Sequence, residues 1–158
     1  MEAEQLSQFV DGLPGTTTFP LQDNVMMTGL MILSEDFDTS PEGYIGDFEA
    51  TVNFASGNMN GSATNFYYAV ETSATTFAGP AEARAGTITL PPTLIAPGLN
   101  SFNLNGTLQI SPSGSAVSVI GSGDGGFVGV NGEGFALEGD VATPGFAEVF
   151  EVGILGQL

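Results

Sequence analysis

Glycine and proline interrupt this chain at short, fairly regular intervals, and this spacing limits what the chain can fold into. There are 23 Gly and 9 Pro among 158 residues, and both residue types end regular elements and form turns. The segments between them are short and alternate apolar with polar residues. Such a rhythm is typical of an all-β sandwich or barrel, and not of alternating β-strands and α-helices.

The segment 46–55, GDFEATVNFA, has the clearest strand pattern. Its apolar face consists of Phe48, Ala50, Val52 and Phe54. Strict alternation of apolar and polar side chains predicts a strand with one buried face and one solvated face. Ser56 and Gly57 then form a turn into the next strand, which we expect over 59–69, so the two strands make a β-hairpin.

Comparable segments predict the remaining strands. They lie at 25–33, 84–90, 101–110, 116–120, 126–130, 135–141 and 147–155, and a further short strand or a loop is expected around 75–77. Hairpin-length connections between eight or nine strands favour an antiparallel up-and-down β-barrel of about eight strands, because closure removes the exposed edges. A two-sheet sandwich is the alternative.

The length of the chain suits one domain. We expect an N-terminal arm over 1–24, with a short helix near Glu2–Val10, and then the barrel domain over 25–158. A barrel of about eight strands is only just wide enough for its own side chains. The residues expected to fill it are Phe48, Phe54, Phe102 and Phe150. A barrel filled in this way holds no ligand inside.

The charge balance excludes several classes of partner. Lys and Arg together number 1 against 18 Asp and Glu, which gives a formal net charge of −17. Such a chain has almost nothing to neutralise phosphates with, so we expect no nucleic acid and no anionic membrane as partner. No apolar run is long enough for a transmembrane helix, so membrane insertion is not expected. A cationic partner or a divalent ion fits this charge better.

The composition also argues against an enzyme. The chain has no His and no Cys, so carboxylates are the only side chains left to act as a general base. Glu133 and Glu138 fall in a turn and on a strand without a supporting motif, and we interpret them as surface charges. The single basic residue, Arg84, is expected to pair with a carboxylate such as Glu82 or Glu71, or to form an ion pair inside the barrel. We expect no cofactor, with calcium as the one exception considered next.

An acidic loop over 34–43, SEDFDTSPEG, is the candidate metal site. Asp36, Asp38 and Glu42 offer the hard oxygen ligands that Ca²⁺ prefers. Their spacing does not match an EF-hand loop, which has a Gly at its sixth position and a Glu at its twelfth. The alternative is a plain acidic loop without a metal.

The loop over 91–100, PPTLIAPGLN, is the second candidate for binding. Its apolar side chains Leu94, Ile95 and Leu99 either form a contact patch for a partner or cover an open end of the barrel. Together with 34–43, this loop is where we expect a rigid scaffold to present its binding residues.

Tyr67 is the third candidate for a contact. Alternation places Phe66 and Tyr68 on one side of their strand and Tyr67 on the other. Tyr67 is therefore either part of an exposed recognition patch, where tyrosine provides a large contact area, or a side chain that fills the barrel.

Two segments of the chain resemble the C-terminal β-barrel domain of bacterial transferrin-binding protein B. Residues 46–66, GDFEATVNFASGNMNGSATNF, resemble the opening hairpin of that domain, and residues 123–141, GDGGFVGVNGEGFALEGDV, are similar to its G-x-F-x-G-x-x-x-E-x-x-G-G pattern. The final strand, FAEVFEVGILGQ, corresponds to the closing Phe- and Gly-rich strand. Residues 128–130 replace the family's frequent Tyr-Gly-Pro, residues 137–139 replace a Gly-Gly pair, and there is no lipobox cysteine. The resemblance implies a barrel and a surface or secreted bacterial binding module of unknown ligand, and it does not imply transferrin binding.

The N-terminal segment bears on where the protein is located. Residues 1–20 contain no basic start and no continuous apolar run, so we identify no signal peptide there. We expect an extracellular or cell-surface binding protein with a protein partner or self-assembly. The alternative is a structural subunit that decorates a virion, a gene-transfer particle or an extracellular filament.

Overall fold

The computed structural model describes residues 13–37, 42–73 and 76–158. These residues form strands and one short 3₁₀ turn. The strands are β1 (Val25–Ser34), β2 (Glu42–Asn53), β3 (Asn58–Ser73), β4 (Thr76–Arg84), β5 (Gly86–Leu94), β6 (Asn100–Leu108), β7 (Val117–Val128), β8 (Gly134–Ala142) and β9 (Val149–Gln157), and the turn is η1 (Pro144–Phe146). The helix expected near Glu2–Val10 lies outside the described residues.

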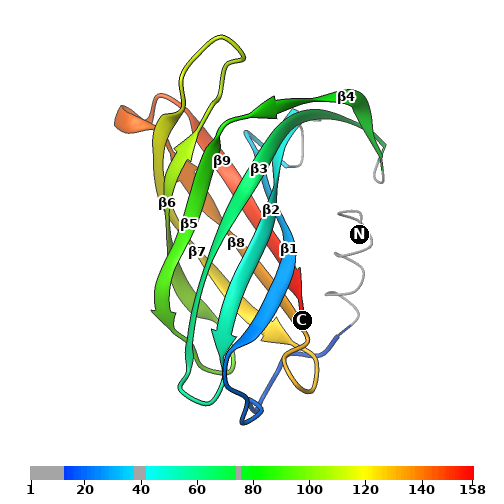
Figure 1. Ribbon diagram of the computed structural model, residues 1–158, viewed down its shortest axis with the longest axis vertical. Helices are drawn as coiled ribbons and strands as arrows, with labels where there is room; N and C mark the ends of the chain where they lie inside the picture. Colours follow the sequence, from blue (N-terminus) through cyan, green and yellow to red (C-terminus); the bar gives the residue numbers. More distant parts are fainter. Residues whose placement is uncertain (1–12, 38–41, 74–75) are drawn as a thin grey trace.

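The sheet closes into an antiparallel barrel of eight strands, as the sequence predicts, and the sandwich alternative is wrong (Figure 1). Neighbours in the chain pair with one another around the ring, and β1 meets β9 to close it, with a register that runs from Thr28 opposite Gln157 to Ser34 opposite Glu151. Closure leaves no free edge in this ring, which protects it from pairing with other chains.

The ninth strand, β4, lies outside the ring. It pairs with the second half of β3, whereas the first half of β3 pairs with β5. Arg84 ends β4 and Gly86 begins β5, so the two strands follow each other almost without a break. The chain passes from the β3–β4 hairpin outside the ring directly into the wall of the barrel. The segment around 75–77, for which a strand and a loop were both open, therefore belongs to a strand of 9 residues that begins at Thr76.

The expected break between the strands at 116–120 and 126–130, over the glycine-rich segment 121–125, is absent. This segment lies inside β7, which joins the two predicted strands into one. A Cβ atom at Gly123 would come within 2.7 Å of the Leu137 side chain on β8. The glycines thus allow the backbone and side chains of the neighbouring strand β8 to approach closely, and they do not reverse the chain.

The interior of the barrel is filled by side chains. The four phenylalanines expected there, Phe48, Phe54, Phe102 and Phe150, are all buried in one hydrophobic cluster. This cluster draws residues from every strand of the ring. A barrel of this size leaves no central chamber when aromatic rings occupy it, so a ligand has to bind outside the packed interior.

One end of the barrel, where β1 begins and β7 ends, is covered by aromatic rings. We call it the closed end. The ring of Phe19, in the segment before β1, lies 5.0 Å from the ring of Phe54 and 5.5 Å from that of Phe127, edge to face in both cases. Phe127 also lies 5.1 Å from Phe135. Edge-to-face pairs of this kind stabilise beyond the area that they bury.

Backbone hydrogen bonds hold the segment before β1 against this end. The Thr16 amide donates to the Phe127 carbonyl at 3.0 Å, and the Gly129 amide donates to the Pro14 carbonyl at 2.6 Å. The Ala55 amide donates to the Gln22 carbonyl at 3.0 Å. The described part of the N-terminal arm is therefore a cover for the barrel.

Substituting alanine for Gly46 is expected to destabilise the barrel. A Cβ atom there would lie 2.6 Å from a ring carbon of Phe66, which is buried, and overpacking of this kind costs about 1–3 kcal/mol. Urea denaturation followed by circular dichroism measures the loss. Gly114→Ala is the matched control, because its Cβ would meet nothing closer than 3.5 Å. Equal stability of the two variants would contradict the tight packing of Phe66.

Candidate functional site

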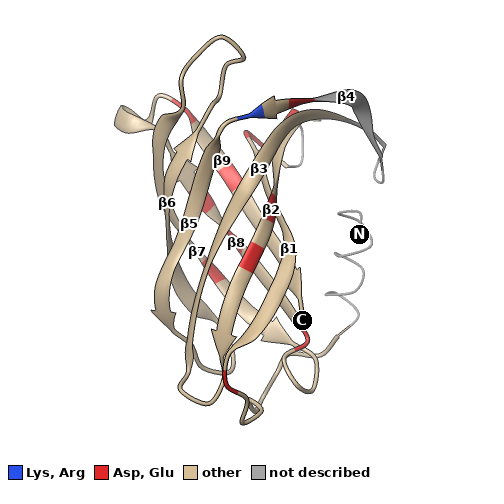
Figure 2. Cartoon of the chain, viewed as in Figure 1, with Lys and Arg blue, Asp and Glu red and all other residues tan. Residues whose placement is uncertain are grey.

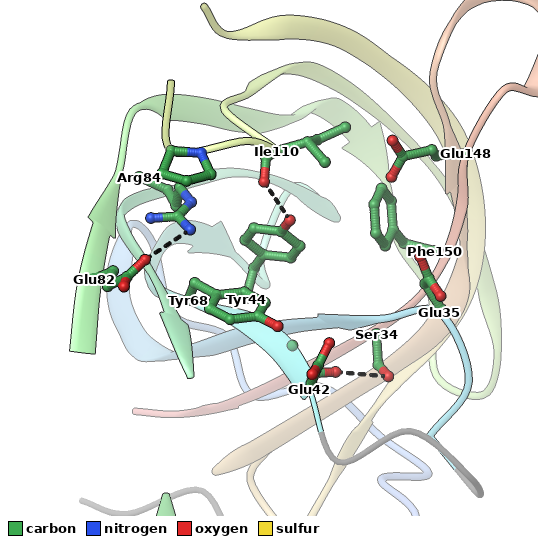
Figure 3. Close-up of a pocket in the computed structure, with 12 residues that line it drawn as sticks. Ser34, Glu35, Glu42, Tyr44, Tyr68, Glu82, Arg84, Ile110, Glu148 and Phe150 are labelled. Atoms are coloured by element: carbon green, nitrogen blue, oxygen red, sulfur yellow. Dashed lines mark hydrogen bonds and ion pairs between the residues drawn. The ribbon is translucent and has the colours of Figure 1, made fainter. Parts of the chain in front are cut away.

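The end opposite the closed end carries a pocket of about 380 Å³. We call this end the rim and the cavity the rim pocket (Figure 3). Its lining comes from the ends of five strands and from the connections beside them. The lining residues are Ser34, Glu35, Glu42, Gly43, Tyr44, Tyr68, Glu82, Arg84, Ile110, Pro112, Glu148 and Phe150. A cavity of this volume falls within the range of small-molecule sites.

Three aromatic side chains form the floor of the rim pocket. Strand register places Tyr44 of β2 opposite Tyr68 of β3. The Tyr44 ring lies 5.5 Å from that of Tyr68 and 5.7 Å from that of Phe150, edge to face in both cases. The Tyr44 hydroxyl donates to the Ile110 carbonyl at 2.8 Å, and its burial raises the pKa of that phenol. The floor is therefore a fixed apolar surface.

Arg84 extends into the rim pocket from the end of β4. Its side chain is only 5% exposed, yet its carboxylate partner Glu82 is 61% exposed, with 3.1 Å between Nη2 and Oε2. Nη1 donates to the Ala83 carbonyl at 3.3 Å, and the guanidinium carbon lies 5.3 Å from the centre of the Tyr68 ring. The predicted pairing of Arg84 with Glu82 is confirmed.

The guanidinium of Arg84 has unused hydrogen-bonding capacity. Its Nε atom is buried and has no hydrogen-bond partner among the described residues. A buried donor without a partner costs free energy, more so when it is charged. Such a group in a structure calls for an explanation, and a ligand in the pocket supplies one.

Four carboxylates share the rim pocket with this one cation. Glu35, Glu42, Glu82 and Glu148 all line the rim pocket, and Arg84 is the only basic side chain of the whole chain (Figure 2). A concave site with an excess of negative charge concentrates field lines and attracts cations. The electrostatics of the rim pocket therefore favour a ligand that brings positive charge.

Tyr68 and Glu42 interact strongly. A hydrogen bond to the Glu42 carboxylate is the main cause that raises the pKa of Tyr68 to about 12. The folded protein therefore favours the protonated phenol of Tyr68. The contribution of this phenol to the free energy of unfolding is complete below about pH 10 and is lost as the pH rises towards 12.

Glu42→Gln is expected to lower the pKa of Tyr68 towards the ordinary phenol value of 10.0, because the charged acceptor is gone. Phenolate absorbance against pH measures the change, and Tyr68→Phe identifies which transition belongs to Tyr68. Glu49→Gln, an exposed change on the same strand, is the control. A Tyr68 transition that stays near pH 12 in Glu42→Gln would contradict the assigned cause.

The structure places two of the three candidate calcium ligands near the rim. Glu42 lines the rim pocket and Asp36 lies just beyond β1, whereas Asp38 lies outside the described residues. No group of three or more metal-ligating side chains is found within the described ranges. Calcium binding stays a prediction.

The candidate contact residues do not form one surface. Leu94 and Leu99 are each 81% exposed, but Leu94 ends β5 and Leu99 lies in the connection to β6, so both are at the closed end, opposite Glu35 and Glu42 at the rim. Ile95 is buried in the core cluster, a position that fits the alternative of a cover for the barrel end, and the contact patch stays a prediction. Tyr67 is half-buried on β3 and lies outside the core cluster, while Phe66 and Tyr68 pack within or against it.

The aromatic floor was missed by reasoning from the sequence. Tyr44 adjoins the acidic loop and Phe150 lies in a predicted strand, and neither is marked by a local motif. The sequence offered one signal for this site, namely Arg84. A single cation in so acidic a chain is expected to attract carboxylates, and the aromatic floor lies beside it.

No protein-family model matches the chain. None of the curated proteins compared with it matches either. The described residues contain no helix with the length and hydropathy needed to cross a bilayer. The barrel implied by the resemblance to transferrin-binding protein B is confirmed, and the family assignment itself stays a prediction.

Proposed function

We propose that this protein is a non-catalytic binding module that takes its ligand in the rim pocket. The observation that carries this proposal is the Arg84 guanidinium, which is buried in the pocket with a donor unpaired among the described residues. A group in this state lowers the stability of the free protein and becomes satisfied when a ligand provides an acceptor.

The arrangement of the barrel supports this role. The interior is packed and the closed end is covered by aromatic rings, so the described part of the fold forms a rigid support beneath the rim. Binding sites are commonly built at one end of such a scaffold. The absence of His, Cys and Lys from the chain leaves little for acid–base or nucleophilic catalysis.

Chemical-shift mapping of the whole chain with a set of anionic, cationic and zwitterionic small molecules tests the proposal. We expect at least one charge class to perturb the backbone signals of Gly43, Arg84 and Ile110 at the rim, while Gly129 at the closed end is unchanged. Perturbation at the closed end alone, or no perturbation by any class, would contradict a binding site in the rim pocket.

As a location we propose the bacterial cell surface or the extracellular space. The resemblance to the transferrin-binding protein B barrel and a surface with few basic groups support this location. Fractionation of producing cells, with detection of the chain in the surface and culture fractions, is the test. Recovery from the cytoplasm alone would contradict it.

A second candidate function is a self-assembling subunit of a particle or filament. Four large aliphatic side chains are exposed in the segments at the closed end, namely Leu21, Leu94, Leu99 and Val130. Residues 94–100 carry no charge, so copies that meet there avoid the repulsion expected from a net charge of −17.

Light scattering over a concentration series separates the two candidates. A monomer at all concentrations favours the binding module, whereas a defined oligomer favours the subunit. The oligomer should then be weakened by the double substitution Leu94→Ser and Leu99→Ser. Ile120→Ser, which removes an equally exposed apolar group from the wall at β7, is the control.

A further inference from the structure

We infer that the ligand of the rim pocket is a small zwitterion whose carboxylate and ammonium groups are separated by a short apolar spacer. This inference rests on the proposed function, and it names the chemical class that the pocket selects. Three features of the pocket lead to it: the state of Arg84, the ring of carboxylates, and the position of Tyr44 between them.

Arg84 is suited to receive a carboxylate. A guanidinium binds a carboxylate through two parallel N–H groups, and such charge-assisted pairs are stronger than neutral hydrogen bonds. Here Nη1 donates to the Ala83 carbonyl and Nη2 donates to the Glu82 carboxylate, while Nε has no partner within the described part of the chain. Glu82 is largely solvated, so it leaves room for a second carboxylate on the guanidinium.

A ligand with only a negative charge does not fit the pocket as a whole. Glu35, Glu42, Glu82 and Glu148 place four acidic groups around one cation, and their combined field opposes the entry of an anion. A ligand with only a positive charge also fits poorly, because it would add a cation near Arg84 and leave Nε unpaired. A zwitterion satisfies both requirements.

The charges are held apart in the pocket. Figure 3 shows Arg84 and Glu82 on one side of Tyr44, and Glu148 and Glu35 on the other. Burial is the main cause that raises the pKa of Tyr44; among the charged groups, Arg84 lowers this pKa, and Glu148, Glu35 and Glu42 raise it. A ligand bound across Tyr44 therefore directs its carboxylate to Arg84 and its ammonium group to the opposite carboxylates.

The surface between the two charges is apolar. Tyr44 and Phe150 pack edge to face there, and Ile110 and Pro112 complete the lining. Methylene groups between the charged ends of a ligand gain free energy by covering such a surface. An α-amino acid, whose charges share one carbon atom, cannot place them on both sides of Tyr44.

Isothermal titration calorimetry of the whole chain tests the inference. The probes are γ-aminobutyrate, ε-aminocaproate and alanyl-alanine as separated zwitterions, glycine as the compact one, and butyrate and butylamine as single charges. We expect a separated zwitterion to bind about tenfold or more tighter than glycine and either single charge. The comparison of alanyl-alanine with the amino acids shows whether a peptide or a free amino acid is the better source of this chemistry.

Variants assign the two ends of the ligand. Arg84→Met is expected to reduce the affinity for the best zwitterion to that of butylamine, and Glu148→Gln to reduce it to that of butyrate. Glu138→Gln, which removes a charge from the exposed wall at β8, should leave the affinity unchanged. Butylamine that binds as tightly as the zwitterions, with no effect of Arg84→Met, would overturn the inference and leave a cation-binding rim pocket. No perturbation of the rim by any charge class would instead contradict the proposed function.

Discussion

Truncating Phe127 to alanine is expected to remove much of the stability of the barrel, by about 3–5 kcal/mol. The Phe127 ring is buried and contacts the rings of Phe19, Phe54 and Phe135 at the closed end. The substitution removes all three aromatic contacts and leaves a cavity beneath the N-terminal cover. Domains of this size have a total stability of about 5–15 kcal/mol, so the loss is a large share of it.

Urea denaturation followed by circular dichroism at 25 °C measures this loss. The matched control is Phe146→Ala, because this residue, the last of η1, is 79% exposed, and removal of its ring should change the free energy of unfolding by no more than about 0.5 kcal/mol. A loss below about 1 kcal/mol for Phe127→Ala would show that the closed end contributes little to the fold. The folded fraction of this variant should still bind at the rim, since the two sites lie at opposite ends.

Replacing Arg84 by methionine is expected to reduce the affinity for a zwitterion to that of butylamine without destabilising the barrel. Arg84 is desolvated, but its partner Glu82 is largely exposed and returns to water when Arg84 is removed. Exchanging a buried charge for an apolar side chain of similar length relieves the desolvation cost. We therefore expect a free energy of unfolding equal to that of the unmodified protein or higher by about 1–2 kcal/mol.

Opposite changes in stability and in binding distinguish a functional Arg84 from a structural one. Arg84→Lys is the companion variant, because it keeps the charge and loses the planar pair of N–H groups; it should bind more weakly than the unmodified protein and more tightly than Arg84→Met. A drop of more than about 2 kcal/mol in the stability of Arg84→Met would identify Arg84 as a support of the rim.

Much of the barrel could be predicted because its strands are amphipathic. Alternation alone placed Phe48 and Val52 on the buried face of β2. The same reasoning failed at Gly123, where glycine suggested a turn. A side chain at Gly123 would meet the Glu138 carbonyl and the Leu137 side chain, which lie on another strand, and no local pattern reveals those neighbours.

The rim pocket could be predicted only in part. Arg84 and Glu82 are two residues apart on one strand, so their side chains share a face and their pairing follows from the sequence. The meeting of Arg84 with Tyr44 and Phe150 depends on barrel closure, which sets the register of β2, β3 and β9 around the ring. The exposed Leu94 and the buried Ile95 are adjacent in one loop, and only the fold decides which of them covers the barrel end.

Because Arg84 is its only basic residue, this chain has a single site for cleavage by trypsin. The only bond that trypsin recognises is the one between Arg84 and Ala85, since no other Lys or Arg is present. That bond lies where β4 passes into β5, and Gln109, the residue after β6, holds it: the Ala85 amide donates to the Gln109 side chain at 2.9 Å, and the Ala85 carbonyl accepts from the Gln109 amide at 2.8 Å. Cleavage therefore requires this part of the rim to open locally. The rate at which the intact chain becomes two fragments measures that opening directly, and an occupied pocket should slow it.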